Sequence, residues 1–154
     1  MSDWKRMTRE VPFENLRPEM IEALKKHIEQ YNLGSILSDA FMCIQTDSEK
    51  TKKPLFGSAE IVYMGVVITA HWLVWVVSGT KTQTAVLSAQ LRDVVIRDYA
   101  QTQFAKMIPD SGMEVSGRFT DVSENGSAFI GLDESQAALK FKETVINVAQ
   151  AAKK

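Results

Sequence analysis

The longest apolar run of the chain lies near its middle, from Met64 to Val77, with the sequence MGVVITAHWLVWVV. A small polar break, Thr69-Ala70-His71, divides this run into two parts of strand length that are rich in valine, isoleucine and tryptophan. Such a pattern predicts two antiparallel strands at the centre of a hydrophobic core. The run is too short to cross a bilayer, because a transmembrane helix needs ~20 apolar residues.

Further apolar and alternating runs predict more strands on both sides of this pair. With the central pair they make seven strands, at Ile36–Ile44, Ala59–Thr69, Trp72–Val77, Thr82–Leu87, Leu91–Tyr99, Met113–Thr120 and Ser127–Leu132. A charged loop over residues 46–54 separates the first two strands, and Asn125-Gly126 predicts a hairpin between the last two. Short hairpin-linked strands without intervening helices indicate an antiparallel sheet.

Apolar residues at intervals of three and four predict one helix before the strands and one after them. The first runs from Arg17 to Leu33, where Pro18 suits the first turn and Gly34 is placed to end the helix in a left-handed conformation. The second runs from Asp133 to Ala152, with Asp133 as the N-cap and Gln136 as its capping-box partner. Residues 1 to about 16 show no regular period and are expected to form an arm with a few apolar anchors.

The order helix, seven antiparallel strands, helix predicts an α+β fold that is mainly β. We expect the sheet to curl into a partly open barrel, with the C-terminal helix capping one end. Residues 1–34 would then form an arm and an amphipathic helix that pack on a domain formed by residues 35–154.

The predicted strand Trp72–Val77 is apolar on both of its faces. Trp72 and Trp75 point to opposite faces, because side chains alternate along a strand. One face fills the barrel, and an uncovered apolar face would be unusual for a soluble protein. Either the N-terminal helix or another protein chain must cover the second face, and we favour the helix.

Composition narrows the class of protein further. The chain has 154 residues, of which 45% are hydrophobic and 24% are charged, as in an ordinary single globular domain. The net charge of −1 gives no general attraction to nucleic acid or to an anionic membrane. A single cysteine, Cys43, excludes an intramolecular disulfide, and the first ten residues lack the apolar segment of a signal peptide. We therefore expect a cytoplasmic protein without a transmembrane segment and without a nucleic-acid partner.

Two stretches of the strand region resemble the pleckstrin-homology (PH) superfamily. Gly65-Val66-Val67-Ile68-Thr69 followed by His71-Trp72-Leu73-Val74-Trp75 is similar to a strand, turn and apolar strand of bacterial PH-like and GRAM-like domains. Ala89-Gln90-Leu91-Arg92-Asp93-Val94 resembles the segment by which these domains enter their fifth strand. The resemblance covers residues 36–152 and implies seven strands followed by a helix. It also implies a binding scaffold without catalytic activity.

Lipid-binding members of this superfamily use basic residues of the loop between the first two strands. That loop and the next hairpin carry four lysines here, Lys50, Lys52, Lys53 and Lys81. They could bind a phosphate or an anionic lipid head group. Asp47 and Glu49 lie beside them, and Glu60 and Tyr63 stand where a further basic residue is wanted, so a solvated loop is the alternative.

Residues with catalytic potential are scattered along the chain. Cys43, His71, Asp93 and Asp98 are the ingredients of a nucleophile, base and acid site, but nothing in their spacing brings them together. Two histidines and one cysteine without paired spacing make no zinc motif, and no glycine loop could cradle a phosphate. We expect no enzyme activity, no metal and no cofactor.

Apolar residues outside the predicted core suggest a different kind of function. Phe104, Met107 and Ile108 lie in a predicted loop, and Trp72 is one of the two tryptophans that point to opposite faces of their strand. They could contact a partner, although the loop residues could also plug the open end of the barrel. The sequence therefore predicts a protein-binding module, with self-association as one form, and anionic lipid binding as the alternative.

Overall fold

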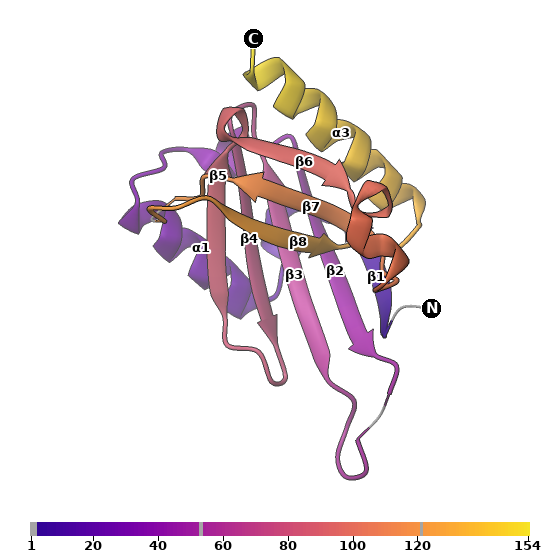
Figure 1. Ribbon diagram of the computed structural model, residues 1–154. Helices are drawn as coiled ribbons and strands as arrows, with labels where there is room; N and C mark the ends of the chain where they lie inside the picture. The colour runs from indigo at the N-terminus through magenta and orange to yellow at the C-terminus, as the bar shows by residue number, and fades with distance from the viewer. Residues whose placement is uncertain (1–2, 53, 121) are drawn as a thin grey trace.

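The chain folds into two antiparallel sheets that face each other (Figure 1). The computed structural model describes residues 3–52, 54–120 and 122–154. Sheet A has five strands in the order β1-β2-β3-β4-β5, which are Trp4–Glu10, Met42–Lys50, Ile61–Ile68, Trp72–Gly79 and Ala85–Gln90. Sheet B has three strands in the order β6-β7-β8, which are Val94–Asp98, Gly112–Gly117 and Gly126–Gly131.

Within the described ranges, three α-helices and four short 3-10 helices complete the fold. The α-helices are α1 (Pro18–Gln30), α2 (Ile36–Asp39) and α3 (Gln136–Ala152). The 3-10 helices are η1 (Phe13–Asn15), η2 (Leu91–Asp93), η3 (Tyr99–Gln101) and η4 (Gln103–Lys106). The predicted class, α+β with mainly antiparallel strands, is confirmed. Over the described residues the two sheets do not close into a barrel.

The hydrophobic side chains form two cores, one on each face of sheet A. The inner core lies between the sheets and is completed by α3, which contributes Phe141 and Val145. The outer core lies between sheet A and α1, where Met20 and Leu24 are fully buried. Figure 1 shows α1 across the side of sheet A that faces away from sheet B.

Strand β4 is the wall that the two cores share. Leu73 and Trp75 belong to the inner core, and Val74 and Val76 belong to the outer core. Trp72 is half-buried and packs against the outer core. The helix α1 thus covers the second apolar face of this strand.

The N-terminal arm contains a strand, which its local sequence does not indicate. β1 pairs antiparallel with β2 along its whole length, from Trp4 opposite Lys50 to Glu10 opposite Ile44. This pairing also extends β2 to Lys50, so the first part of the predicted charged loop is strand. Among the alternate, less exposed residues of β1, Arg6 and Thr8 are polar, which hides the usual apolar alternation.

The prediction of a strand at residues 36–44 is wrong in its first half. Residues 36–39 form the single-turn helix α2, and the strand begins at Met42. The carbonyl of Ser35 accepts hydrogen bonds from the backbone N–H groups of Ser38 and Asp39, at 3.1 and 3.0 Å. The Ser35 hydroxyl donates to the Asp39 carboxylate at 2.6 Å, so local polar contacts close the turn.

Each long helix differs from the prediction at one terminus, α3 at its N-terminus and α1 at its C-terminus. The N-cap of α3 is Ser135, whose hydroxyl accepts from the backbone N–H of Ala138, and not Asp133. At the end of α1 the first left-handed residue is Asn32, at φ 53°, two positions before Gly34. The N–H of Leu33 donates to the carbonyl of Ile28 at 3.0 Å, which completes a Schellman motif around Asn32.

The Asn125-Gly126 pair does not form a two-residue hairpin turn. The last pair of the β7–β8 ladder is Gly117 opposite Gly126, so the connection between the strands is longer than two residues. Phe119 in this connection turns into the inner core, where its ring meets that of Trp75 edge-on at 5.5 Å between centroids. A buried aromatic residue therefore sets the shape of this loop.

Candidate interaction surfaces

Three apolar side chains project from the segment between η3 and β7. Phe104, Met107 and Ile108 are 50%, 79% and 60% exposed. We call these three residues the η4 ridge. Sequence analysis singled out the same residues, either as a contact for a partner or as a plug of the open end of the barrel. In the structure all three side chains are exposed.

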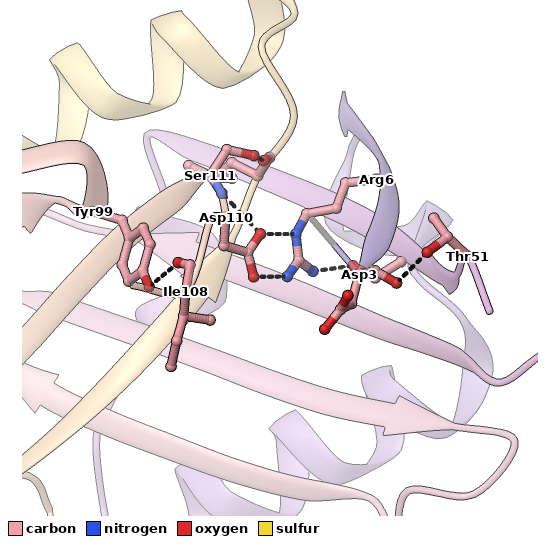
Figure 2. Close-up of polar contacts among 9 residues, drawn as sticks. Asp3, Arg6, Thr51, Tyr99, Ile108, Asp110 and Ser111 are labelled. Carbon is pink, nitrogen blue, oxygen red and sulfur yellow. Dashed lines mark hydrogen bonds and ion pairs between the residues drawn. The ribbon is translucent and has the colours of Figure 1, made fainter. Parts of the chain in front are cut away.

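The backbone of the ridge is held by hydrogen bonds at several points. The Tyr99 hydroxyl donates to the carbonyl of Ile108 at 2.6 Å, as Figure 2 shows. The N–H of Ile108 donates to the carbonyl of Phe104 at 2.8 Å, and the buried Thr102 hydroxyl donates to the carbonyl of Tyr99 at 2.8 Å. The exposed side chains therefore stand on an ordered backbone.

An ion pair fastens the end of this segment to β1 (Figure 2). The Arg6 guanidinium donates to both carboxylate oxygens of Asp110, at 3.1 Å from Nε and 2.7 Å from Nη2. Its third nitrogen donates to the Ser48 hydroxyl at 2.5 Å. The two side chains of the pair are only 11% and 15% exposed. A two-point contact of this kind fixes orientation as well as distance.

Sequence reasoning missed both Arg6 and Asp110. They are 104 positions apart, and neither lies in a recognisable motif. The one available signal is the alternation of Trp4, Arg6 and Thr8, three residues with hydrogen-bonding groups on one face of a strand. Thr8 also has a partner far away in the sequence, because its backbone N–H donates to the Asp133 carboxylate at 2.8 Å.

A hollow of about 320 Å³ lies beside the ridge, over the outer face of sheet B. Its apolar wall includes the rings of Tyr99 and Phe129, which meet at 5.1 Å between centroids. Asp110 and Glu114 also line it, but each already binds an arginine, since Arg97 donates to Glu114 at 2.6 Å. The hollow therefore suits an apolar side chain better than a free cation.

Three of the predicted lysines, Lys50, Lys52 and Lys81, lie near one end of sheet A. Lys50 ends β2, with its ammonium 5.6 Å from the centre of the Trp4 ring. Lys52 and Lys81 are exposed, and Lys53 lies outside the described residues. The N–H of Thr80 donates to the carbonyl of Ile61 at 3.0 Å, which sets the hairpin of Lys81 beside the start of β3. Glu49 and Glu60 occupy the same end of the sheet.

The loop that carries Lys52 also carries the two most exposed large apolar side chains among the described residues. Leu55 is 92% exposed and Phe56 is 87% exposed. Sequence analysis did not single them out. The available signal was an adjacent leucine and phenylalanine bracketed by Pro54 and Gly57 in a loop otherwise made of polar and small residues.

Cys43 has the properties of a structural thiol. It is 7% exposed, and burial raises its pKa to about 12, with smaller contributions from the carboxylates of Glu14 and Glu10. The thiolate needed for nucleophilic attack is therefore scarce at neutral pH. His71 is exposed at the turn between β3 and β4.

Two kinds of site are absent from the described part of the chain, a metal-binding cluster and a membrane-spanning helix. It contains no group of three or more histidine, cysteine, aspartate or glutamate residues placed to hold a metal ion. None of its helices combines the length and the apolar character needed to span a membrane.

Comparisons with protein-family models, with curated proteins and with solved structures found no match for this chain.

Proposed function

We propose that this protein is a non-enzymatic PH-like binding module that acts by contacting a protein partner through the η4 ridge. The observation that carries the proposal is the exposure of Phe104, Met107 and Ile108 on a backbone held by hydrogen bonds. Exposed apolar groups that stand together mark interaction sites, and an ordered backbone reduces the entropy lost on binding.

The arrangement of the strands supports the PH-like part of the proposal. From β2 onward the chain has four strands in sheet A, three in sheet B and then the helix α3. This is the order that the resemblance implies for residues 36–152. On this view β1 and α1 are additions, one extending sheet A and the other covering its outer face.

The hollow next to the ridge supports a protein partner over a small polar ligand. Its aromatic wall accepts an apolar side chain, and both of its carboxylates are already paired. A partner could rest on the ridge and place one apolar residue in the hollow. Such a central apolar anchor is typical of the residues that dominate binding energy at protein interfaces.

Binding of an anionic lipid head group is the weaker candidate. Lys50, Lys52 and Lys81 share their end of the sheet with Glu49 and Glu60, so the local positive field is reduced. Phosphate recognition is strongest where several cationic groups converge.

Site-specific photo-crosslinking tests the proposal in cells. A photoreactive phenylalanine replaces Met107, and in the matched control it replaces Lys25, an exposed residue on α1. We expect a discrete adduct from position 107 that disappears when Phe104→Ser and Ile108→Ser are added. An adduct of twice the chain mass from the purified protein would identify the partner as a second copy. Equal adducts from both positions, or none from position 107, would contradict the proposal.

A further inference from the structure

A second apolar projection lies at the far end of sheet A from α2. The loop between β2 and β3 extends beyond the end of the sheet and carries Leu55 and Phe56 (Figure 1). Its neck is closed, because the N–H of Lys50 donates to the carbonyl of Glu60 at 2.9 Å and Ala59 is buried. We call residues 54–57 the tip.

Positive residues stand next to the apolar tip in the sequence. Residues 51–59 include Lys52 and Lys53 and no acidic residue. Lys52 is exposed and makes no ion pair within the described parts of the chain. A partner for the tip should therefore offer an apolar hollow with negative charge at its rim.

Such a hollow exists at the opposite end of sheet A. It has a volume of about 410 Å³, with walls that include Phe13, Leu37 and Phe41 and a rim that includes Glu10 and Glu14. No lysine, arginine or histidine lines it. We call it the Glu14 groove, because Glu10 already pairs with Lys140 at 2.8 Å whereas Glu14 is exposed.

The tip cannot reach the groove of its own chain. Strand β2 begins at Met42, which lines the groove, and ends at Lys50, at the neck of the loop. At ~3.3 Å per residue, this strand separates the two features by more than ~25 Å. Only another molecule can therefore bring a tip to the groove.

We propose that the tip of one copy inserts into the Glu14 groove of a second copy, with Lys52 facing Glu14. The two surfaces differ, so the contact is heterologous, and a bound pair of copies still presents one free tip and one free groove. Repetition then gives open head-to-tail chains. The inference uses residues separate from the η4 ridge and holds whether or not the ridge binds a partner.

Charge favours a second copy over an anionic membrane as the occupant. Glu49 and Glu60 at the loop neck and the net charge of −1 oppose approach to an anionic surface. The same net charge is too small to prevent copies from associating, and the residues next to the tip and the rim of the groove carry opposite signs.

Sedimentation velocity over protein concentrations from about 1 μM to about 1 mM, the range expected for a small interface, tests the proposal. We expect the average mass to rise with concentration without a plateau at the dimer. The tip variant Leu55→Ser/Phe56→Ser and the groove variant Glu14→Lys/Phe41→Ser should each be monomeric alone. Their side chains are exposed, so both variants should keep the circular dichroism spectrum of the parent chain.

The decisive measurement mixes the two variants. The tip variant keeps an intact groove and the groove variant keeps an intact tip, so the mixture should form a one-to-one dimer and nothing larger. The matched control, Phe104→Ser/Met107→Ser, should still form species larger than a dimer, because its tip and its groove are both intact. A parent chain that stays monomeric, or a mixture that stays monomeric, would overturn the proposal. Binding of monomeric protein to phosphatidylserine vesicles that is lost in the tip variant would also overturn the proposal.

Discussion

Arg6 contacts two distant segments of the chain at once. Its guanidinium joins β1 to the segment after the η4 ridge through Asp110, and it also binds Ser48. Arg6→Met should remove the two-point contact with an Asp110 side chain that is only 15% exposed, and lower the free energy of unfolding by about 2–3 kcal/mol. Urea denaturation measures this loss.

Arg9 on the same strand provides the control. Its contact with Asp47 is longer, at 3.6 Å, and its side chain is 49% exposed. Arg9→Met should therefore cost less than about 1 kcal/mol, as exposed ion pairs do. Equal losses from the two substitutions would show that the pair with Asp110 contributes no more than a surface contact.

Cys43 gives a prediction about alkaline pH. Burial raises its thiol pKa from 9.0 to about 12, so between these values the native state keeps a proton that the unfolded state has lost. The free energy of unfolding then falls as pH rises through this window, by up to about 1.4 kcal/mol per pH unit. The contribution is fully present below pH 9.

The variant Cys43→Ala isolates this effect from the titration of lysines and tyrosines. The stability of the parent chain relative to Cys43→Ala should fall by about 1–2 kcal/mol between pH 8 and pH 10.5. Urea denaturation at several pH values measures it. A constant difference across the series would show that the thiol ionises as easily in the native state as in the unfolded chain.

Among the elements, α1 makes a clear energetic prediction. Leu24 lies on its buried face and is fully enclosed by the outer core. Leu24→Ala should lower the free energy of unfolding by about 2–5 kcal/mol, because it leaves a cavity between the helix and sheet A. Lys25→Ala, one position further on the exposed face, should change it by less than about 0.5 kcal/mol. Thermal or urea denaturation compares the two.

The elements also show what the sequence can and cannot predict. Helix α1 and the strands β3 and β4 were predicted near their observed bounds, because their apolar periods repeat locally and match a buried face. Strand β1 was missed because Arg6 and Thr8 find their partners in Asp110 and Asp133, more than 100 positions away. No local period records such a partner.

The candidate surfaces divide in the same way. Phe104, Met107 and Ile108 could be singled out from sequence because apolar residues in a loop are unusual. Their exposure depends on where the Tyr99 hydroxyl and the Arg6 ion pair hold the segment. The Glu14 groove could not be predicted from the sequence. Its walls come from η1, α2 and β2, and only the fold determines how these elements pack.

At the scale of the whole molecule, the two cores share one wall. Leu73 and Trp75 of β4 face the inner core, Val74 and Val76 face the outer core, and all four are at most 3% exposed. Adjacent residues of β4 belong to different cores, so the strand cannot leave one core and stay packed in the other. Loss of either core should therefore unfold sheet A. We therefore expect a single cooperative unfolding transition for the entire chain.

The three tryptophans allow this expectation to be measured core by core. Trp4→Phe/Trp72→Phe leaves Trp75 to report on the inner core, and Trp4→Phe/Trp75→Phe leaves Trp72 to report on the outer core. In each variant the urea midpoint from tryptophan fluorescence should equal the midpoint from far-ultraviolet circular dichroism, whatever the stability of that variant. If Trp72 fluorescence changed at lower urea than the circular dichroism signal, α1 would be leaving sheet A before the sheets unfold. The outer core would then be a separate unit of stability, and the shared strand would not couple the two.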